Sequence, residues 1–348
     1  MDRYYTEILD KVEGVLSRAV PATSDKGWIS RAVGPVKGKI AEKVVDKINE
    51  PAVELLSRGG KRWRPVSMVL CCEIAGGEVE NALPLVPLVE FPHNGSLIVD
   101  DIEDGAVLRR GKEAVHLMFG EDVSVNSGNL LYFLPTYLID ESTFEEELKL
   151  RLYRYYTTSL RRLHFGQGLD IQWHNNHEEY PSVDEYMQMC RLKTGCLSRF
   201  AAQTGFAIGG TDPNTCLTLG DIFEDIGVAF QIIDDVINLT TGNPGKSRGD
   251  DIVEGKKSLP VIFHAMVDPD SIPVLSEHFA AAGDKNNSGA EEHIEAAIKM
   301  LEGTGSIERA QSRAFEMIRG AKGMLERSFQ SSSALDSLLD LFDSFHSA

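Results

Sequence analysis

The stretch HNGSLIVDDIEDGAVLRRGKEAVH, residues 93–116, places four acidic residues in the five positions 100–104 and two arginines shortly after them. Asp100, Asp101 and Asp104 are spaced i, i+1, i+4, so on a helix Asp100 and Asp104 share a face. Like charges at that spacing repel one another. Divalent cations would neutralise the group, and Mg²⁺ suits it because it takes hard oxygen ligands and shares its shell with phosphates.

A second acidic cluster follows in FQIIDDVINL, residues 230–239. Asp234, Asp235 and Asn238 repeat the i, i+1, i+4 spacing, again inside an apolar helical pattern. A single acidic cluster is more often a solvated helix face. Two clusters with the same spacing, each in a hydrophobic helix, instead favour two metal-binding walls that hold a diphosphate.

Basic residues gather before the first cluster and directly after it. RGGKRWRP, residues 58–65, has four cations in eight positions, in a chain whose formal net charge is -18. Its glycines allow the backbone to approach an anion, and arginine forms forked contacts with phosphate oxygens. A basic turn at a helix start is the simpler interpretation of this stretch alone. Arg109 and Arg110 add anion donors beside the expected metal ligands.

Two later stretches supply further polar candidates: RLKTG and PGKSRGDDIVEGKKSLP contain Lys193, Thr194, Lys246, Lys256 and Lys257. GNPGKS resembles a phosphate-binding loop, but that pattern needs glycine where Thr240 stands. His174 and His177 are spaced for a possible metal site, although two polar histidines in such a stretch are more often exposed to solvent.

Composition restricts the class of protein. A chain of 348 residues with 42% hydrophobic and 25% charged residues can bury a sizeable core. The acidic balance argues against nucleic acid as the main partner. Neither a membrane-spanning apolar run nor a secretory signal is present. The five cysteines are odd in number and form no CxxC pair, which indicates reduced thiols in a cytoplasmic protein.

Helical periodicity dominates the chain. Apolar residues recur at three- and four-residue steps over 39–56, 144–163 and 219–239, while strand-like alternation is scarce. Breaks rich in Gly, Asn, Asp or Pro fall at 58–65, 211–214, 241–251 and 281–292. None is long enough for a domain linker. The pattern predicts one all-helical domain over residues 1–348, with roughly a dozen helices.

Taken in order, these motifs resemble the trans-isoprenyl diphosphate synthase, or polyprenyl synthetase, family. The resemblance rests on GGKRWRP, HNGSLIVDDIEDGAVLRRG, GQGLDI, KTG, FQIIDD and GDDIVEGKKSLP, between about residues 55 and 262. The sequence around the first cluster and the segment GQGLDIQW most resemble the eukaryotic-type geranylgeranyl diphosphate synthases. The resemblance implies the all-α isoprenoid synthase fold, with helices around a deep central cavity, and a homodimer.

The activity that the resemblance implies is head-to-tail prenyl transfer. An allylic diphosphate (dimethylallyl, geranyl or farnesyl) ionises, isopentenyl diphosphate attacks the cation, and a proton leaves. Mg²⁺, about three ions per site in the family, would be held by Asp100, Asp101, Asp104, Asp234 and Asp235. The substrate contacts implied are Arg109, Lys193 and Lys246 for the allylic diphosphate, and Lys61, Arg64, His93 and Arg110 for isopentenyl diphosphate. Thr194 and Gln231 would face the carbocation, and Lys256 is a further substrate-binding residue.

The chain departs from the family pattern at two positions. Asn238 replaces the last aspartate of the second motif and, as a neutral oxygen donor, should bind metal more weakly. Pro92 interrupts the backbone hydrogen bonding of a helix expected to be continuous. One turn before Asp100, Gly95 and Ser96 are small where members with short products carry an aromatic floor. We therefore expect a C20 or longer product, with His164 and Phe165 as a deeper floor.

Alternatives remain open at this point. A farnesyl diphosphate synthase would share the mechanism and differ in product length. A class I terpene cyclase also uses an aspartate cluster with Mg²⁺ but needs no pocket for a second diphosphate. A non-catalytic partner subunit or helical scaffold would be expected to lose site residues, whereas nearly all are present.

Overall fold

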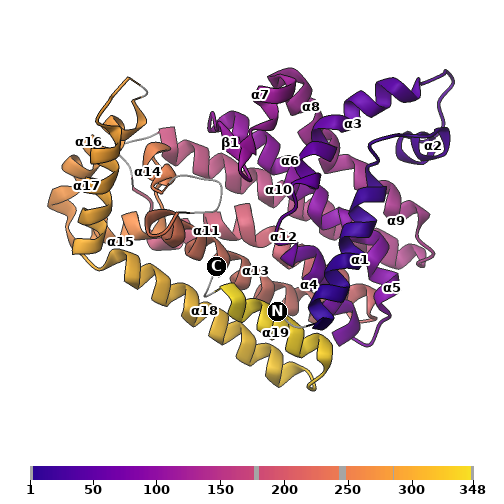
Figure 1. Ribbon diagram of the computed structural model, residues 1–348. Coiled ribbons are helices and arrows are strands. Elements are labelled where there is room, and N and C mark those ends of the chain that lie inside the picture. The colour runs from indigo at the N-terminus through magenta and orange to yellow at the C-terminus, as the bar shows by residue number, and fades with distance from the viewer. Residues whose placement is uncertain (1–2, 176–179, 243–247, 285, 346–348) are drawn as a thin grey trace. The chain divides into compact units, whose positions relative to one another are not determined.

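Helices make up nearly all the regular structure of the computed structural model, which describes residues 3–175, 180–242, 248–284 and 286–345 (Figure 1). Within these ranges the only strands are β1 (Leu108–Arg109) and β2 (Lys112–Glu113), which pair antiparallel as a short hairpin. The all-α prediction is therefore confirmed. None of the helices in the described ranges is long and apolar enough to cross a membrane.

The chain divides into two compact units. Unit 1 comprises Met1–Leu160, Phe200–Gly220 and Ser331–Leu341, and unit 2 comprises the remaining segments. The expectation of a single domain stays a prediction. The helices that belong to unit 1 alone are α1 (Arg3–Ala19), α2 (Lys26–Val33), α3 (Glu42–Ser57), α4 (Trp63–Ile74), α5 (Val79–Ala82), α6 (Pro87–Glu103), α7 (Val115–Phe119), α8 (Glu121–Phe133) and α9 (Tyr137–Glu141), with 3-10 turns at Leu83–Leu85 and Leu134–Thr136.

Unit 2 holds the second set of helices. These are α11 (Val183–Cys190), a π-helical turn (Arg191–Gly195), α14 (Asp250–Val253), α15 (Leu259–Val267), α16 (Ile272–Gly283), α17 (Ala290–Gly303) and α18 (Ser306–Ser328), with a 3-10 turn at Pro269–Ser271. Residues of both units occur in α10 (Glu146–Asn175), α12 (Cys196–Ile208), α13 (Pro213–Leu239) and α19 (Ser333–Ser344).

Local sequence signals account for the helix boundaries. The predicted helices over 39–56, 144–163 and 219–239 correspond to α3, α10 and α13, and the Gly- and Pro-rich stretches 58–65 and 211–214 contain the breaks before α4 and α13. At the start of α11, Ser182 and Glu185 form a capping box: the Ser182 Oγ accepts from the Glu185 N–H at 3.2 Å, and the Glu185 carboxylate accepts from the Ser182 N–H at 2.8 Å.

In unit 1, α6 packs closely against α8. The helix runs without interruption from Pro87 to Glu103, through Pro92. Gly95 on α6 and Gly128 on α8 face each other, and a Cβ built on Gly95 would lie 2.7 Å from the Gly128 carbonyl oxygen. Only glycine permits so close a crossing, so the pair fixes how α6, and the aspartates at its end, are placed within the unit.

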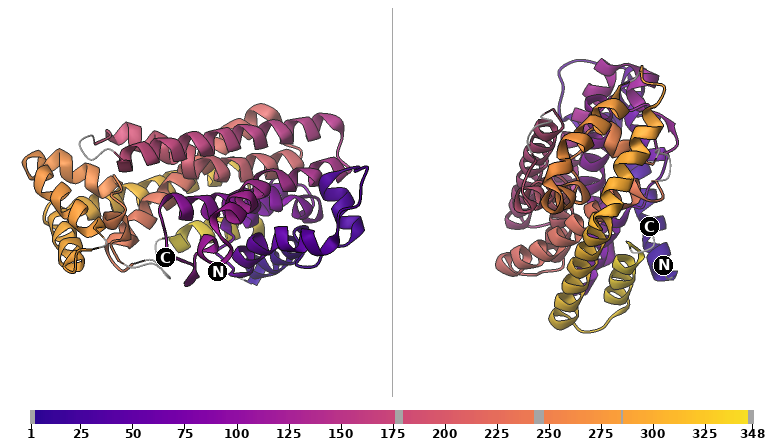
Figure 2. Two further views of the ribbon diagram at one scale, coloured as in Figure 1. Left: turned by 90° about the horizontal axis from the view of Figure 1, so that it is seen from above. Right: turned by 90° about the vertical axis from the view of Figure 1, so that its left-hand side faces the viewer.

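In unit 2, α16 and α17 lie side by side, as both views of Figure 2 show, and α15 packs against α18. His264 on α15 is buried and bonds to Thr304 at 3.0 Å and Ser271 at 2.9 Å. All five cysteines of the chain are buried free thiols, which agrees with the sequence interpretation.

Candidate active site

The first carboxylate cluster lies where α6 ends, in unit 1. Asp104 caps the helix in a helical backbone conformation, and its N–H donates to the Asp100 carbonyl at 2.8 Å. The predicted i, i+4 relation between Asp100 and Asp104 is therefore present. Asp101 is fully buried, while the other two side chains are half-buried.

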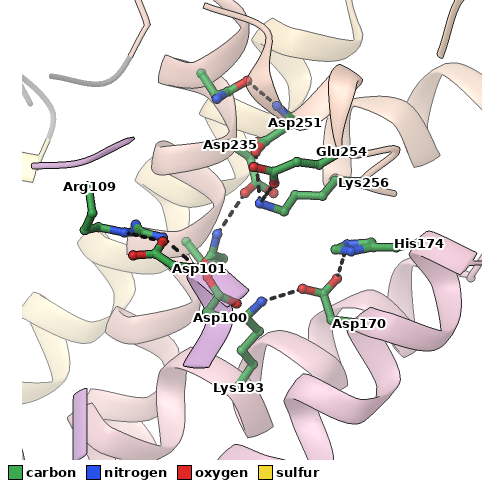
Figure 3. A network of polar contacts seen from close by, with 12 residues as sticks. Asp100, Asp101, Arg109, Asp170, His174, Lys193, Asp235, Asp251, Glu254 and Lys256 are labelled. Atoms are coloured by element: carbon green, nitrogen blue, oxygen red, sulfur yellow. Dashed lines mark hydrogen bonds and ion pairs between the residues drawn. The ribbon is translucent and has the colours of Figure 1, made fainter. Parts of the chain in front are cut away.

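Arg109, on the β1–β2 hairpin, lies against these carboxylates (Figure 3). Its Nε donates to the Asp101 Oδ1 at 2.8 Å, its Nη2 contacts the same oxygen, and Nη2 is 3.6 Å from the Asp100 Oδ2. The hairpin thus carries a guanidinium to the end of α6. A guanidinium and a group of carboxylate oxygens therefore lie together, and their roles toward phosphate and metal stay predictions.

A concentration of positive charge surrounds His93, which lies two helical turns before Asp100 on the same face of α6. Burial, together with the charges of Arg64 and Arg110, holds the pKa of His93 well below its ordinary value, so the imidazole is neutral at physiological pH. Burial also lowers the pKa of Arg110 to about 10. The charges of Arg64 and Arg110 thus act on His93 within one buried region of unit 1, and an anion site there stays a prediction.

Two of the four cations in the stretch 58–65 hold the turn in place. Arg62, whose φ is 46°, donates to the Glu13 carboxylate at 2.8 Å and to the buried Glu90 carboxylate at 2.6 Å. Arg58 donates to the Arg109 carbonyl at 2.9 Å. This division leaves Lys61 and Arg64 as the residues of this stretch to which the resemblance assigns substrate contacts.

Gly95, which the sequence analysis assigns to product length, lies at a close crossing of two helices. A Cβ built on Gly95 would point toward α8. It would lie 2.7 Å from the Gly128 carbonyl oxygen and 3.1 Å from the Leu131 Cβ. Gly95 is therefore small where two helix backbones cross, and its role in product length stays a prediction. Ser96 lies on the stripe of His93 and Asp100, and its hydroxyl donates to the His93 carbonyl at 2.8 Å.

His164 and Phe165, the suggested deeper floor, lie on α10 in unit 2. Both side chains are exposed within that unit, Phe165 to 72%. Their role in product length stays a prediction. Of the other suggested residues, Lys246 and His177 lie outside the described residues.

On α10 of unit 2, Asp170 links two basic side chains (Figure 3). The Lys193 ammonium donates to the Asp170 Oδ2 at 2.5 Å, and the His174 Nε2 is 2.9 Å from the Asp170 Oδ1. Burial alone would raise the pKa of Asp170, but Lys193 and His174 outweigh it and hold the pKa below its usual range. Sequence reasoning did not single out Asp170, although it stands in the quoted GQGLDI motif.

A polar chain leads from the π-helical turn to the second cluster. The Thr194 hydroxyl donates to the Gln231 Oε1 at 2.8 Å, and the Gln231 amide donates to the Asp235 Oδ1 at 2.9 Å. Tyr186 donates its hydroxyl to the other oxygen, Oδ2, of Asp235 at 2.6 Å. Both carboxylate oxygens of this buried aspartate therefore have donors, whereas Asp234 beside it is half-buried.

Negative charge accumulates around Asp235. Burial and the neighbouring Asp251 charge raise the pKa of Asp235 to about 8, despite the hydrogen bonds from Tyr186 and Gln231. Lys256 contacts the carboxylates of Asp251, at 3.3 Å, and Glu254 (Figure 3). Burial is the main cause of the raised pKa, and the binding of a divalent cation at these carboxylates stays a prediction.

Asn238 has a different neighbour from the one expected of a metal ligand. It is 1% exposed, and its Oδ1 accepts from the Asp251 backbone N–H at 3.2 Å, in the first turn of α14. The side chain thus satisfies a helix N–H that has no partner within α14. This contact places Asn238 beside Asp251 as a helix cap, and the expectation that Asn238 binds metal weakly stays a prediction.

No group of three or more His, Cys, Asp or Glu side chains in the described ranges is arranged to hold a metal ion by itself. The protein is all-α, and its carboxylate clusters lie beside basic side chains. Such a site is suited to a phosphorylated substrate and a divalent cation.

Comparison with known proteins gives the family. The family model described as polyprenyl synthetase matches residues 45–301. The geranylgeranyl pyrophosphate synthase of Clitopilus passeckerianus is 33% identical over 268 residues, which cover 75% of each chain. The solved geranylgeranyl pyrophosphate synthetase from Pyrococcus horikoshii Ot3 aligns with a TM-score of 0.83, 26% identity and 100% coverage of both chains.

A third comparison involves a ligand complex. The polyprenyl synthase from Caulobacter crescentus CB15, solved with calcium and isoprenyl diphosphate, aligns with a TM-score of 0.81 and 25% identity, covering 99% of this chain and 96% of that one. The chain belongs to the polyprenyl synthetase family, as its motifs predicted, and it is a transferase of that family.

Proposed function

We propose that this protein condenses isopentenyl diphosphate with an allylic diphosphate, head to tail, to give a trans-prenyl diphosphate. The observation that carries the proposal is the grouping of Arg64 and Arg110 around His93, because a cyclase that ionises a single diphosphate needs no such second cationic group. Lys61 completes the proposed isopentenyl diphosphate contacts. Arg109, Lys193, Lys256 and, outside the described residues, Lys246 are proposed for the allylic diphosphate.

Magnesium is the proposed cofactor, at about three ions per site as in the family. Asp100, Asp101, Asp104 and Asp234 would hold it directly. We assign Asp235 to a supporting role, since both of its oxygens already accept hydrogen bonds. When bound, the metal supplies positive charge that stabilises the departing diphosphate. The calcium and isoprenyl diphosphate bound to the Caulobacter crescentus relative support this assignment.

The residues of the chain account for the remaining steps. Lys193 and Arg109 bind and orient the allylic diphosphate, so that ionisation occurs beside fixed positive charge. The oxygens of Thr194 and Gln231 direct their dipoles at the developing carbocation. Neither cluster offers an obvious strong base, and the released diphosphate is the proposed acceptor of the proton.

We propose a C20 or longer product, from a dimethylallyl, geranyl or farnesyl starter. The proposal now rests on Ser96 alone of the two small residues, because Gly95 is turned toward α8. A homodimer and a cytoplasmic location are further proposals. The geranylgeranyl synthases among the relatives support the product, and five buried free thiols support the reducing compartment.

The decisive experiment incubates the purified chain with Mg²⁺, labelled isopentenyl diphosphate and each allylic starter, and separates the dephosphorylated products by chromatography. We expect label in a prenyl alcohol of C20 or longer, and loss of turnover in Asp100→Asn but not in Asp10→Asn, an exposed aspartate of α1. Starter ionisation without incorporation of label would indicate a terpene cyclase. A C15 product would indicate a farnesyl diphosphate synthase, and no turnover at all would indicate a non-catalytic partner subunit.

A further inference from the structure

A single π-helical turn, Arg191–Gly195, interrupts the helical stretch that runs from α11 to α12 in unit 2. Such turns contain one residue more than an α-helical turn and are rare, and they occur frequently at functional sites. This one carries Lys193 and Thr194. The extra residue changes the direction of both side chains, so whatever holds the turn in place also decides where they point.

Two glycines on neighbouring helices touch the backbone of this turn. A Cβ built on Gly166 of α10 would lie 2.2 Å from the Lys193 nitrogen and 2.7 Å from the Lys193 Cα. A Cβ on Gly227 of α13 would lie 2.7 Å from the Gly195 Cα and 2.7 Å from the Ser198 Oγ. Because the atoms met include backbone on both sides, any side chain at Gly166 or Gly227 would push the turn away.

Each glycine stands one helical turn before the residue that receives a side chain of the π-helical turn. Gly166 precedes Asp170 by four positions, and Asp170 accepts from Lys193 at 2.5 Å. Gly227 precedes Gln231 by four positions, and Gln231 accepts from Thr194 at 2.8 Å. Residues four apart share a helix face. On each of the two helices, α10 and α13, one face therefore supplies both the close backbone contact with the π-helical turn and the polar partner of its side chain.

We infer that Gly166 and Gly227 are positioning residues for the transfer reaction. Gly166 sets the distance at which Lys193 reaches Asp170 and the allylic diphosphate, and Gly227 sets the distance at which Thr194 reaches Gln231 and the carbocation. The inference rests on the proposed function. It adds that the KTG segment requires glycine on two other helices, at Gly166 and Gly227, to hold its π-helical turn.

The test measures binding of inorganic pyrophosphate with Mg²⁺ by titration calorimetry in a double-mutant cycle of Gly166→Ala and Lys193→Ala. Gly168→Ala is the matched control, because the same helix leaves open space around that position. We expect Gly166→Ala to weaken binding about 10- to 100-fold, the loss of one charged hydrogen bond. In the Lys193→Ala background, Gly166→Ala should weaken pyrophosphate binding by less than about twofold.

Fully additive losses, or an unchanged affinity in Gly166→Ala, would overturn the inference. If Gly166→Ala does not fold, the inference is tested by Gly227→Ala alone. Gly227→Ala should lower kcat about tenfold or more while the KM for the allylic diphosphate changes less than about threefold, and the reverse pattern would refute its part. If the wild-type chain neither binds pyrophosphate nor forms product, the proposed function fails instead.

Discussion

Lys257 is a buried cation for which the cost of burial can be compared with the stabilisation from two aromatic rings. It is 3% exposed, and its ammonium lies 4.6 Å from the centroid of the Tyr180 ring and 5.5 Å from that of Phe279. In the described part of the chain no carboxylate lies within salt-bridge distance of it. Burial lowers the pKa of Lys257 to about 8, from 10.5. We therefore predict that replacing it with methionine stabilises the protein at neutral pH.

The magnitude follows from that difference. A fall of the pKa from 10.5 to about 8 corresponds to a penalty of about 3 kcal/mol on the charged form. Two desolvated cation–π contacts offset about 1–2 kcal/mol of it. The unfolded chain keeps the proton up to about pH 10.5, and the folded chain loses it near pH 8, so stability rises with pH across that window. Below about pH 8 the full penalty applies.

The assay is urea unfolding at about pH 7 and about pH 10. Lys257→Met should raise the free energy of unfolding by about 1–2 kcal/mol at the lower pH, and the gain should fall toward zero at the higher one. Lys299→Met, at an exposed position on α17, is the control and should change little at either pH. A Lys257→Met protein that is less stable than the wild type at about pH 7 would show that the aromatic contacts outweigh the burial penalty.

Three further changes test unit 1. Gly95→Ala should lower the free energy of unfolding by about 1–3 kcal/mol through overpacking against α8, while Gly14→Ala, in the interior of α1, should be neutral or slightly stabilising; equal effects in thermal unfolding would contradict the helix crossing. Arg62→Ala should cost about 3–5 kcal/mol, because it leaves the buried Glu90 carboxylate without its cation, and a loss under about 1 kcal/mol in urea unfolding would argue against that ion pair. Ser96→Phe should shorten the product in the chromatographic assay, and an unchanged chain length would remove Ser96 from the tail path.

The sequence predicted the helices and both aspartate clusters because these depend on local periodicity. The i, i+4 relation of Asp100 and Asp104 follows from helix geometry as soon as the segment is helical. Arg109 could also be placed, since it follows the cluster by only five residues. Contacts between residues that are close in the sequence can therefore be predicted from the sequence alone.

Features that depend on distant contacts could not be predicted in this way. The small size of Gly95 suggested an open tunnel, and its close approach to Gly128 on α8 could not be seen in the sequence. Asn238 appears in a ligand position of the motif, yet its oxygen caps a helix that begins a dozen residues later. Asp170 became recognisable only through its contact with Lys193.

The crossing of α6 and α8 restricts how this enzyme can diverge. An enzyme can change its product specificity by enlarging one side chain at a time. At Gly95, however, the first added methyl group already collides with main-chain atoms of α8. Gly128 is closed in the same way, because a Cβ there would meet the Val99 side chain at 2.8 Å and the Gly95 oxygen at 3.0 Å. Descendants with altered specificity should therefore retain both glycines and vary elsewhere.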